Sequence, residues 1–464
     1  MSLRKKIALK IEKHMSASQI MVVGFAAAIL LGGILLSLPV CNADGEWLTF
    51  IDALFTSCSA VCVTGLVTIV PATQFSLIGK VILLSLIQLG GLGIIACTMG
   101  AFLILHKQIT IRSRVMIQET YNMNTLSGLV AMLIYVLKGT FLAEGIGAFL
   151  YSFQMIPEYG FFRGIWYAVF HSVSAFCNAG IDILGDSSLQ KYQLNPLINL
   201  TTVFLIIVSG LGFTVWKDLA ETLKRIIRRE CGIRRAMEKM KLHTKVVLSM
   251  TILLIMVGTI GVYGLESGNP ATLKEMSVGE KWMASLFQSV TTRTAGFFTI
   301  PQNLFREETK LLCCMLMFAG GSPGGTAGGV KTTTIAILLL NCWSVLKGNE
   351  ETECFRRKIQ QATIRTGFSI FTVAFLTMLT GTIVLITIEQ VPMIDALYEA
   401  TSAVATVGLT TGITPLLSSA GKILIIVLMY MGRLGPVTLA LMFASKVGEK
   451  KHLVKLPEER IMVG

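Results

Sequence analysis

Cys62-Val63-Thr64-Gly65-Leu66 ends a short apolar segment with a turn at glycine, and the pattern recurs three times along the chain. The later copies are Cys177-Asn178-Ala179-Gly180-Ile181, Arg293-Thr294-Ala295-Gly296-Phe297 and Ala405-Thr406-Val407-Gly408-Leu409. Their glycines are 115, 116 and 112 residues apart, so one unit occurs four times. Four quasi-equivalent turns can surround one axis, which is how a single polypeptide lines an ion pore.

The composition indicates a membrane protein. Hydrophobic residues make up 53% of the 464-residue chain, charged residues 14%, and the mean hydropathy is +0.69, which is too apolar for a surface that faces water. Eight apolar runs approach or exceed the ~20 residues that cross a bilayer core. They cover residues 18–40, 76–105, 126–153, 197–216, 245–265, 311–346, 366–388 and 421–444. The sequence therefore predicts an all-α integral membrane fold with eight transmembrane helices.

The positions of the basic residues predict the orientation. Five segments, 1–16, 106–124, 217–245, 347–365 and 446–464, hold 28 of the 40 Lys and Arg residues. An even number of crossings separates each of them from the N-terminus, and the positive-inside rule makes that side cytoplasmic. We therefore expect both termini in the cytoplasm. The basic run 224–235 has two interpretations, a stop-transfer flank beside lipid or a site for anionic headgroups or a partner protein.

Each repeat is interpreted as an outer span, a short amphipathic helix, the glycine turn and a second span. The repeats are residues 17–124, 125–241, 242–360 and 361–446, between an N-terminal segment 1–16 and a tail 447–464. A helix of a dozen residues cannot cross a ~30 Å core, so the chain must dip in and return. Non-helical backbone at that depth is tolerated only where protein or a water-filled path surrounds it. Four such segments predict a helix–pore loop–helix unit, repeated with pseudo-symmetry around one pore.

The turns have the chemistry of a monovalent cation site. A glycine turn can aim consecutive backbone carbonyls at the axis, and carbonyls carry no formal charge. A divalent cation would require carboxylates, and the four turns contain neither Asp nor Glu; Asp182 is the nearest. The carbonyl ends of the preceding helices add partial negative charge.

These turns resemble the selectivity-filter loops of the Trk/Ktr/HKT superfamily of potassium transporters, and the likeness covers about residues 17–446. Eight predicted spans, rather than ten, make the chain most similar to the Ktr membrane subunit (KtrB type). The resemblance implies potassium-selective transport, because family members with serine in the first turn favour sodium and this chain has Gly65. A transporter of sodium or another monovalent cation with the same fold is the alternative. The implied K+ ligands are the backbone carbonyls of Cys62, Val63, Thr64, Gly65, Cys177, Asn178, Ala179, Gly180, Arg293, Thr294, Ala295, Gly296, Ala405, Thr406, Val407 and Gly408.

The resemblance also implies the setting of the protein. It predicts a homodimer in a bacterial plasma (inner) membrane, resting on a cytosolic ring of nucleotide-binding regulatory subunits of the KtrA type. No covalent cofactor and no nucleic-acid partner are expected. K+ is the transported ion, and Na+ is a candidate activator.

Three cationic residues fall within the membrane zone, where each costs about 2.5–3.5 kcal/mol on insertion scales. Arg433-Leu434-Gly435 occupies the place of Gly91-Leu92-Gly93 and Gly210-Leu211-Gly212 in the earlier repeats. We expect Arg433 to project into the pore below the filter, where the resemblance assigns a gate; a purely structural ion pair is the competing interpretation. Arg293 is expected to support the third turn from behind, and Lys331 to end a loop near the cytoplasm.

That loop interrupts the second span of repeat three. Glycines and a proline in such density cannot hold a helix, at about 1 kcal/mol per glycine and about 3 kcal/mol for proline. Its position and its likeness to the intramembrane gating loop of the family predict a barrier that swings aside. The predicted gate residues are Gly320, Gly321, Ser322, Pro323, Gly324, Gly325, Thr326, Ala327, Gly328, Gly329, Lys331 and Arg433.

Other classes of function are disfavoured. Residues 324–332 nearly match a phosphate-binding loop, but Val330 stands where that motif needs Lys. A secondary transporter with a midplane site would show inverted halves, whereas the order of elements is the same in all four repeats. An enzyme would need clustered nucleophiles or bases, and of five His residues only His171 lies near a turn, where it is expected to pack within its helix.

Overall fold

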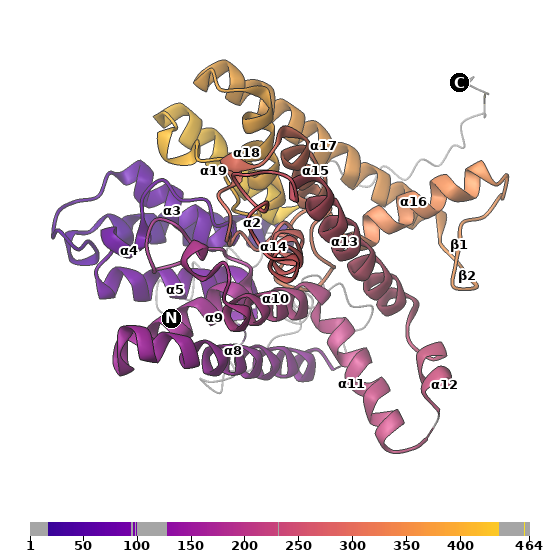
Figure 1. Ribbon diagram of the computed structural model, residues 1–464. Coiled ribbons are helices and arrows are strands. Elements are labelled where there is room, and N and C mark those ends of the chain that lie inside the picture. The colour runs from indigo at the N-terminus through magenta and orange to yellow at the C-terminus, as the bar shows by residue number, and fades with distance from the viewer. Residues whose placement is uncertain are drawn as a thin grey trace, which may run out of the picture.

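The computed structural model describes residues 17–93, 96, 97, 99, 128–230, 232–435 and 459, and these are predominantly helical (Figure 1). Four helices are long and apolar enough to cross a membrane: α2 (Ala17–Ser37), α8 (Leu129–Tyr159), α13 (Leu242–Glu266) and α17 (Gln361–Glu389). Each begins one of the predicted repeats. Large apolar side chains on their outer faces are exposed, as expected of a surface that contacts lipid.

Each long helix is followed by a short helix, a turn and a further helix. The short helices are α3 (Phe50–Cys62), α9 (Phe161–Cys177), α14 (Val278–Thr291) and α18 (Met393–Ala405). The helices after the turns are α5 (Leu77–Leu92), α10 (Pro196–Leu211), α15 (Glu307–Phe318) and α19 (Ser419–Leu434). Smaller elements are η1 (Pro39–Cys41), α4 (Pro71–Gln74), η2 (Gln190–Tyr192), α11 (Phe213–Ile227), α12 (Ile233–Glu238), η3 (Gln302–Leu304), α16 (Thr332–Leu346), the antiparallel pair β1 (Glu353–Cys354) and β2 (Arg357–Lys358), and η4 (Thr414–Leu416).

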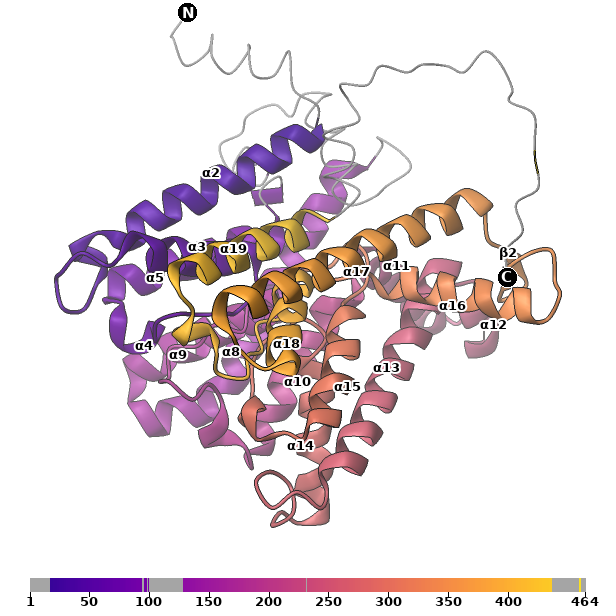
Figure 2. The same ribbon diagram turned by 90° about the horizontal axis from the view of Figure 1, so that it is seen from above.

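Helix packing closes a cycle. The helix after each turn packs against the short helix of the next repeat: α5 against α9, α10 against α14, α15 against α18, and α19 back against α3. In Figure 1 the colours accordingly run in order around the centre, from indigo through magenta and red to yellow. Figure 2 shows α2, α19 and α17 along one side of the same molecule. The contact between α19 and α3 thus joins repeat four to repeat one.

Within a repeat, a serine joins the short helix to the long one. The hydroxyl of Ser57 donates to the Ile29 carbonyl at 2.8 Å, and Ser172 and Ser289 make the same contact in repeats two and three. Each of these serines lies against a glycine of the long helix, where a methyl group would collide with it: Gly32, Gly147 and Gly258. Small residues at these positions let the two helices approach closely.

The second spans depart from expectation. Residues 197–216 were expected to form one helix, but α10 ends at Leu211 and the chain bends by 97° into α11. Gly212 adopts φ +92°, and Gly93 and Gly435, where α5 and α19 end, adopt φ +85° and +78°. The Gly-x-Gly and Arg-x-Gly patterns therefore mark helix breaks rather than smooth spans. The described residues contain four helices of spanning length and one bent pair, so the count of eight spans stays a prediction.

Two ion pairs join neighbouring repeats. Asp52 of α3 accepts from Lys422 of α19 at 2.7 Å, and Asp395 of α18 accepts from Lys310 of α15 at 2.9 Å. Their side chains are only 10–18% exposed. The two aspartates occupy equivalent positions in the segment Ile-Asp-Ala-Leu, which occurs at residues 51–54 and again at residues 394–397. The equivalent ion pairs explain why the aspartate recurs.

Removing one partner of either pair should lower stability, because the remaining charge loses its counter-ion in a poorly solvated position. We expect Asp52→Ala and Lys422→Ala each to cost about 1–3 kcal/mol, and the double variant to cost less than the sum. Apparent unfolding temperatures in detergent measure this effect. Lys191→Ala is the matched control, because its pair with Glu158 lies at the surface with Lys191 63% exposed. Equal losses in Asp52→Ala and the control would contradict the prediction.

Candidate cation site

The four predicted turns meet at one place. A methyl group on Gly65 would lie 2.6 Å from the carbonyl oxygen of Ala179, the residue before the glycine of the second turn. A methyl group on Gly180 would likewise lie 2.6 Å from the Ala295 carbonyl oxygen, and one on Gly296 would lie 2.5 Å from the Val407 carbonyl oxygen. A methyl group on Gly408 would lie closest of all to the Thr64 carbonyl oxygen, which returns to the first turn. The turns therefore touch in the order one, two, three, four, one.

The backbone of the turns is repeated residue by residue. The residue two before each glycine is left-handed, with φ of 56° at Val63, 58° at Asn178, 71° at Thr294 and 52° at Thr406. The glycines follow with φ of 101°, 63°, 82° and 94° in the same order. A left-handed non-glycine residue costs on the order of 1–3 kcal/mol and persists only where its surroundings fix it. Four at equivalent positions indicate that the conformation serves a function.

Hydroxyl groups of the short helices fix the turns. The Gly65 N–H donates to Ser59 Oγ at 2.9 Å, and the Gly408 N–H donates to Ser402 Oγ at 3.0 Å. In the other turns Ser174 and Thr291 donate to the carbonyl of the residue after the glycine. The Ala295 N–H bonds four residues back, to Thr291, whereas its equivalents bond five residues back. The hydrogen-bonded loop of the third turn is thus one residue smaller, although α14 ends earlier relative to its glycine than the other short helices do.

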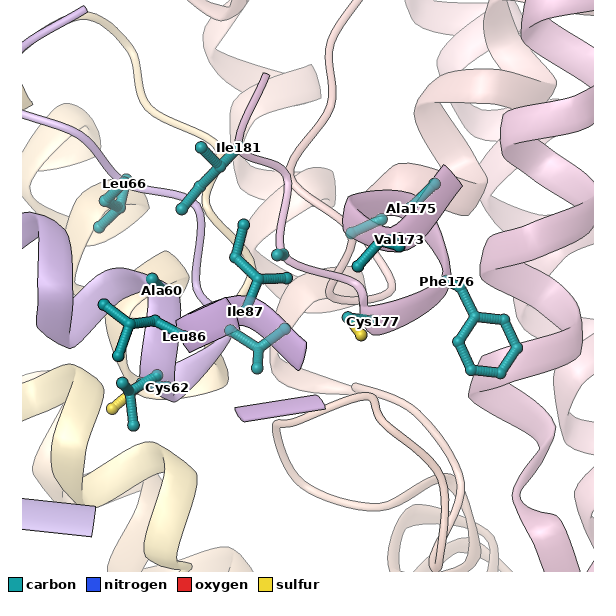
Figure 3. Close-up of a cluster of buried hydrophobic side chains, with 14 of the residues drawn as sticks. Ala60, Cys62, Leu66, Leu86, Ile87, Val173, Ala175, Phe176, Cys177 and Ile181 are labelled. Atoms are coloured by element: carbon teal, nitrogen blue, oxygen red, sulfur yellow. The ribbon is translucent and has the colours of Figure 1, made fainter. Parts of the chain in front are cut away.

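An apolar core lies behind the turns. Figure 3 shows Ile87 of α5 between the end of α3, near Ala60 and Cys62, and Cys177 at the end of α9. The Cys177 thiol donates to Gln88 Oε1 at 3.6 Å, and the Cys62 thiol lies 3.8 Å from that of Cys58. These cysteines face away from the turns as buried packing groups, as expected.

A small cavity of about 70 Å³ opens next to the four glycines. Asp182 and Asp186, both from the connection between α9 and α10, lie in its wall. Partial desolvation, with the charge of Asp186 adding to it, raises the pKa of Asp182 to about 6, while the Leu184 N–H, which donates to its Oδ1 at 3.1 Å, opposes the rise. The cavity places negative charge at one mouth of the ring of turns. We name it the acidic vestibule.

The glycine-rich loop, residues 320–331, lies against the other side of the turns. No helix forms between Phe318 and Thr332, and the loop hydrogen-bonds to the left-handed residues of two turns. Asn178 donates to Thr326 Oγ1 at 2.8 Å, and the Gly328 N–H donates to Thr294 Oγ1 at 3.2 Å. A methyl group on Gly328 would collide with Thr406 Oγ1. The loop therefore contacts three of the four turns directly.

Two cationic side chains hold this loop. Arg433 donates through Nη1 to the Thr326 carbonyl at 2.8 Å and through Nη2 to the Gly90 carbonyl of α5. Lys331 donates to the Ala327 carbonyl at 2.7 Å and the Gly328 carbonyl at 3.4 Å. Among the described residues, Arg433 thus pairs with carbonyl groups rather than with an acid, and it connects repeat one to the loop of repeat three.

The break at Gly212 also contacts the loop. The Phe213 N–H donates to the Gly324 carbonyl at 2.9 Å, and the Ser322 N–H donates to the Gly210 carbonyl at 3.0 Å. The loop is therefore bonded to the point where α10 turns into α11. This contact was not anticipated from the sequence, because nothing local in residues 210–213 refers to residues 322–324.

The other predicted residues lie behind the turns. Arg293 is 5% exposed and donates to Thr251 Oγ1 of α13 at 3.4 Å, so it points away from the centre. His171 is buried in α9 with Nδ1 2.7 Å from the Tyr167 carbonyl. Sequence reasoning missed the serine and threonine hydroxyls that fix the turns, although Ser59 and Ser402 each stand six residues before their glycine.

Apolar helices and turns that converge at one centre are typical of one class of protein, the multi-pass membrane transport proteins. Residues 5–453 match the TrkH family, described as cation transport protein. The chain is 38% identical to the potassium/sodium uptake protein NtpJ of Enterococcus hirae over 100% of both chains, and 35% identical to Ktr system potassium uptake protein B of Bacillus subtilis over 96% of both. Its fold is similar to that of the potassium transporter TrkH from Vibrio parahaemolyticus, with a TM-score of 0.72, 20% identity, and coverage of 94% of this chain and 86% of that one.

The chain belongs to the TrkH family of cation transport proteins. It is a transporter and not an enzyme.

Proposed function

We propose that this chain is the potassium-selective, ion-translocating subunit of a bacterial K+ uptake system, built from four pseudo-symmetric repeats around one pore. The observation that carries the proposal is the cyclic contact of each filter glycine with the carbonyl of the next turn. The carbonyls of Thr64, Ala179, Ala295 and Val407 then surround one position, where they can replace the hydration shell of a cation.

The electrostatics favour a monovalent ion. Four helices end at the turns, so the negative ends of their dipoles converge there without any formal charge. In the described part of the chain, Thr64 Oγ1, Asn178 Oδ1 and Thr406 Oγ1 are buried without a hydrogen-bond partner. Buried oxygens of this kind normally find a partner, and a passing cation or its water would supply one. The acidic vestibule would gather cations at the outer mouth.

The glycine-rich loop is the proposed gate. It lies across the inner side of the turns, and Arg433 and Lys331 hold it there with positive charges that oppose a cation below the filter. Conduction would require the loop to leave this position. Glycine supplies the backbone freedom for such a movement.

The family supports a proposal for the assembly. The Bacillus subtilis relative is named as protein B of a Ktr system for potassium uptake. We propose a homodimer on a KtrA-type nucleotide-binding ring, in the inner membrane with both termini cytoplasmic. Sodium is the second candidate ion, because the Enterococcus relative is named for potassium and sodium uptake. Na+ could then act as cargo or as activator.

Complementation tests the proposal. Expression in a bacterium that lacks its own potassium uptake systems should restore growth at low external K+, with Rb+ uptake that excess K+ inhibits and excess Na+ does not. The empty vector is the control. Growth without Rb+ uptake, or 22Na+ uptake that exceeds Rb+ uptake at equal concentrations, would overturn potassium selectivity in favour of the sodium alternative.

Uptake should depend on external pH through the acidic vestibule. The Asp182 carboxylate is charged above its pKa of about 6 and neutral below it, so cation uptake should fall as the external pH drops through about 6. Initial Rb+ uptake between pH 5 and 8 measures this effect. Asp182→Asn should take up Rb+ at all pH values at the rate that wild type shows at pH 5, so its rate should no longer depend on pH in this range. A variant that keeps the wild-type profile would contradict the assignment.

A further inference from the structure

We propose that a second cavity, between repeats three and four, binds one acyl chain of a bilayer lipid directly against the glycine-rich loop. The cavity has a volume of about 370 Å³. Its inner wall is formed by residues 328–331 of the loop and by residues 431–435, the last turn of α19 and the glycine that follows it. Its outer wall is formed by α17. We name it the lateral cavity.

The lateral cavity is lined by groups that suit hydrocarbon. Ile370, Val373 and Ala374 of α17 face Phe318 and Val404 across it. The two cations in the wall, Lys331 and Arg433, already donate to loop carbonyls at 2.7 and 2.8 Å. Lys331 and one nitrogen of Arg433 are therefore directed at the loop, and the other terminal nitrogen of Arg433 is directed at Gly90 of α5. An acyl chain requires no hydrogen bonds and fits the remaining apolar surface.

The position of α17 identifies the occupant. This helix has the length and hydropathy of a membrane span, and its residues Val373, Phe375 and Leu376 are 46%, 40% and 55% exposed. Val373 lines the cavity, Phe375 packs against Phe318 of its wall with ring centroids 6.3 Å apart, and Leu376 lies on the outer face of the same turn. Val373 thus belongs both to the cavity wall and to the surface that contacts bilayer hydrocarbon.

An acyl chain in this position would touch the loop itself. Gly328 and Gly329 form part of the wall, and Gly328 is bonded to the third filter turn through Thr294. Any outward movement of the loop toward α17 would need the space that the chain fills. Occupancy therefore opposes displacement of the loop, a consequence that rests on the gating role proposed above.

Photochemical labelling tests the site without measuring transport. The full chain is reconstituted in phosphatidylcholine vesicles in which a fraction of the lipid carries a diazirine on its acyl chain, and labelled peptides are mapped by mass spectrometry. We expect adducts on Ile370, Ala374 or residues 432–435, as well as on Leu376. In Ala374→Trp the cavity adducts should fall at least tenfold, while the Leu376 adduct remains as the internal control.

Two outcomes would overturn the proposal. The first is wild-type labelling confined to Leu376 and other outer positions. The second is a crosslink from the cavity to another part of this chain or to a second copy, which would mean that protein fills the space. Should Ala374→Trp fail to fold by size-exclusion chromatography, Thr377→Phe makes a smaller change to the same wall.

Rubidium flux from the same vesicles tests the effect on the loop. Ala374→Trp should conduct several-fold less than Leu376→Trp, because the indole fills the cavity permanently, whereas an acyl chain exchanges with the bilayer and leaves the space free for part of the time. Leu376→Trp adds the same side chain to the outer face of α17. Equal flux in the two variants would overturn the effect on the loop. If neither variant nor wild type conducts, the proposed transport function fails, while the labelling result still decides whether lipid occupies the cavity.

Discussion

Replacing Gly65 by Ser is expected to reduce the preference for K+ over Na+ at least tenfold. The added Cβ would lie 2.6 Å from the Ala179 carbonyl oxygen, and φ of +101° is a conformation that side chains resist. Relief of the clash must move the carbonyl or the turn. Strain of about 1–3 kcal/mol at one quarter of the ring is enough for a tenfold change, which corresponds to about 1.4 kcal/mol.

Uptake of Rb+ and Na+ by complemented cells, each corrected for the amount of protein in the membrane, measures this prediction. Gly185→Ser is the matched control: Gly185 lines the acidic vestibule, a Cβ there meets nothing within 4 Å, and its φ is not left-handed. The control should keep the wild-type ratio. Unchanged selectivity in Gly65→Ser would argue strongly against the filter assignment.

Replacing Arg433 by Ala is expected to raise Rb+ flux about tenfold. The substitution removes the hydrogen bonds to the carbonyls of Thr326 and Gly90, and it removes a positive charge below the turns. A hydrogen bond to a charged group contributes about 1.5–3 kcal/mol, so the loop should leave its position at least ten times more often. Deletion of residues 324–328 should act in the same direction.

Rb+ flux from vesicles with a fixed K+ gradient measures how often the loop leaves its position. Arg433→Lys retains the charge without the forked geometry that reaches two carbonyls, so it should fall between wild type and Arg433→Ala. Lys347→Ala, at the exposed end of α16, removes a basic residue far from the loop and should have no effect. Lowered or unaltered flux in Arg433→Ala would mean that neither the charge nor its bonds restrain conduction.

The repeat and the turns could be predicted because they are local. A glycine after a short apolar helix allows a turn wherever it occurs, so the recurrence of residues 62–66 predicted four equivalent turns. The left-handed residues two before each glycine were not predicted and come from the structure. The loop after Phe318 follows from the same logic, since its composition cannot support a helix.

The long-range contacts could not be predicted because they depend on the order of the repeats in space. Asp52 and Lys422 are 370 residues apart, and only closure of the cycle brings them to 2.7 Å. The break after Leu211 was missed because hydropathy stays high across Gly212, and hydropathy carries no information on helix direction. Two predicted spans, 76–105 and 421–444, end outside the described residues: nearly all of 94–105 and all of 436–444 are not described, so the ends of those spans stay predictions.

The sharp bend at Gly212 has a mechanical consequence. In Figure 1, α11 and α12 extend away from the rest of the molecule like a handle, and the base of that handle is bonded to residues 322 and 324. A force that moves α11 would act directly on the glycine-rich loop. The contact is made one residue after the bend at Gly212, where the Phe213 N–H donates to the Gly324 carbonyl. A force applied to α11 would therefore reach the proposed gate directly, without passing through the proposed filter.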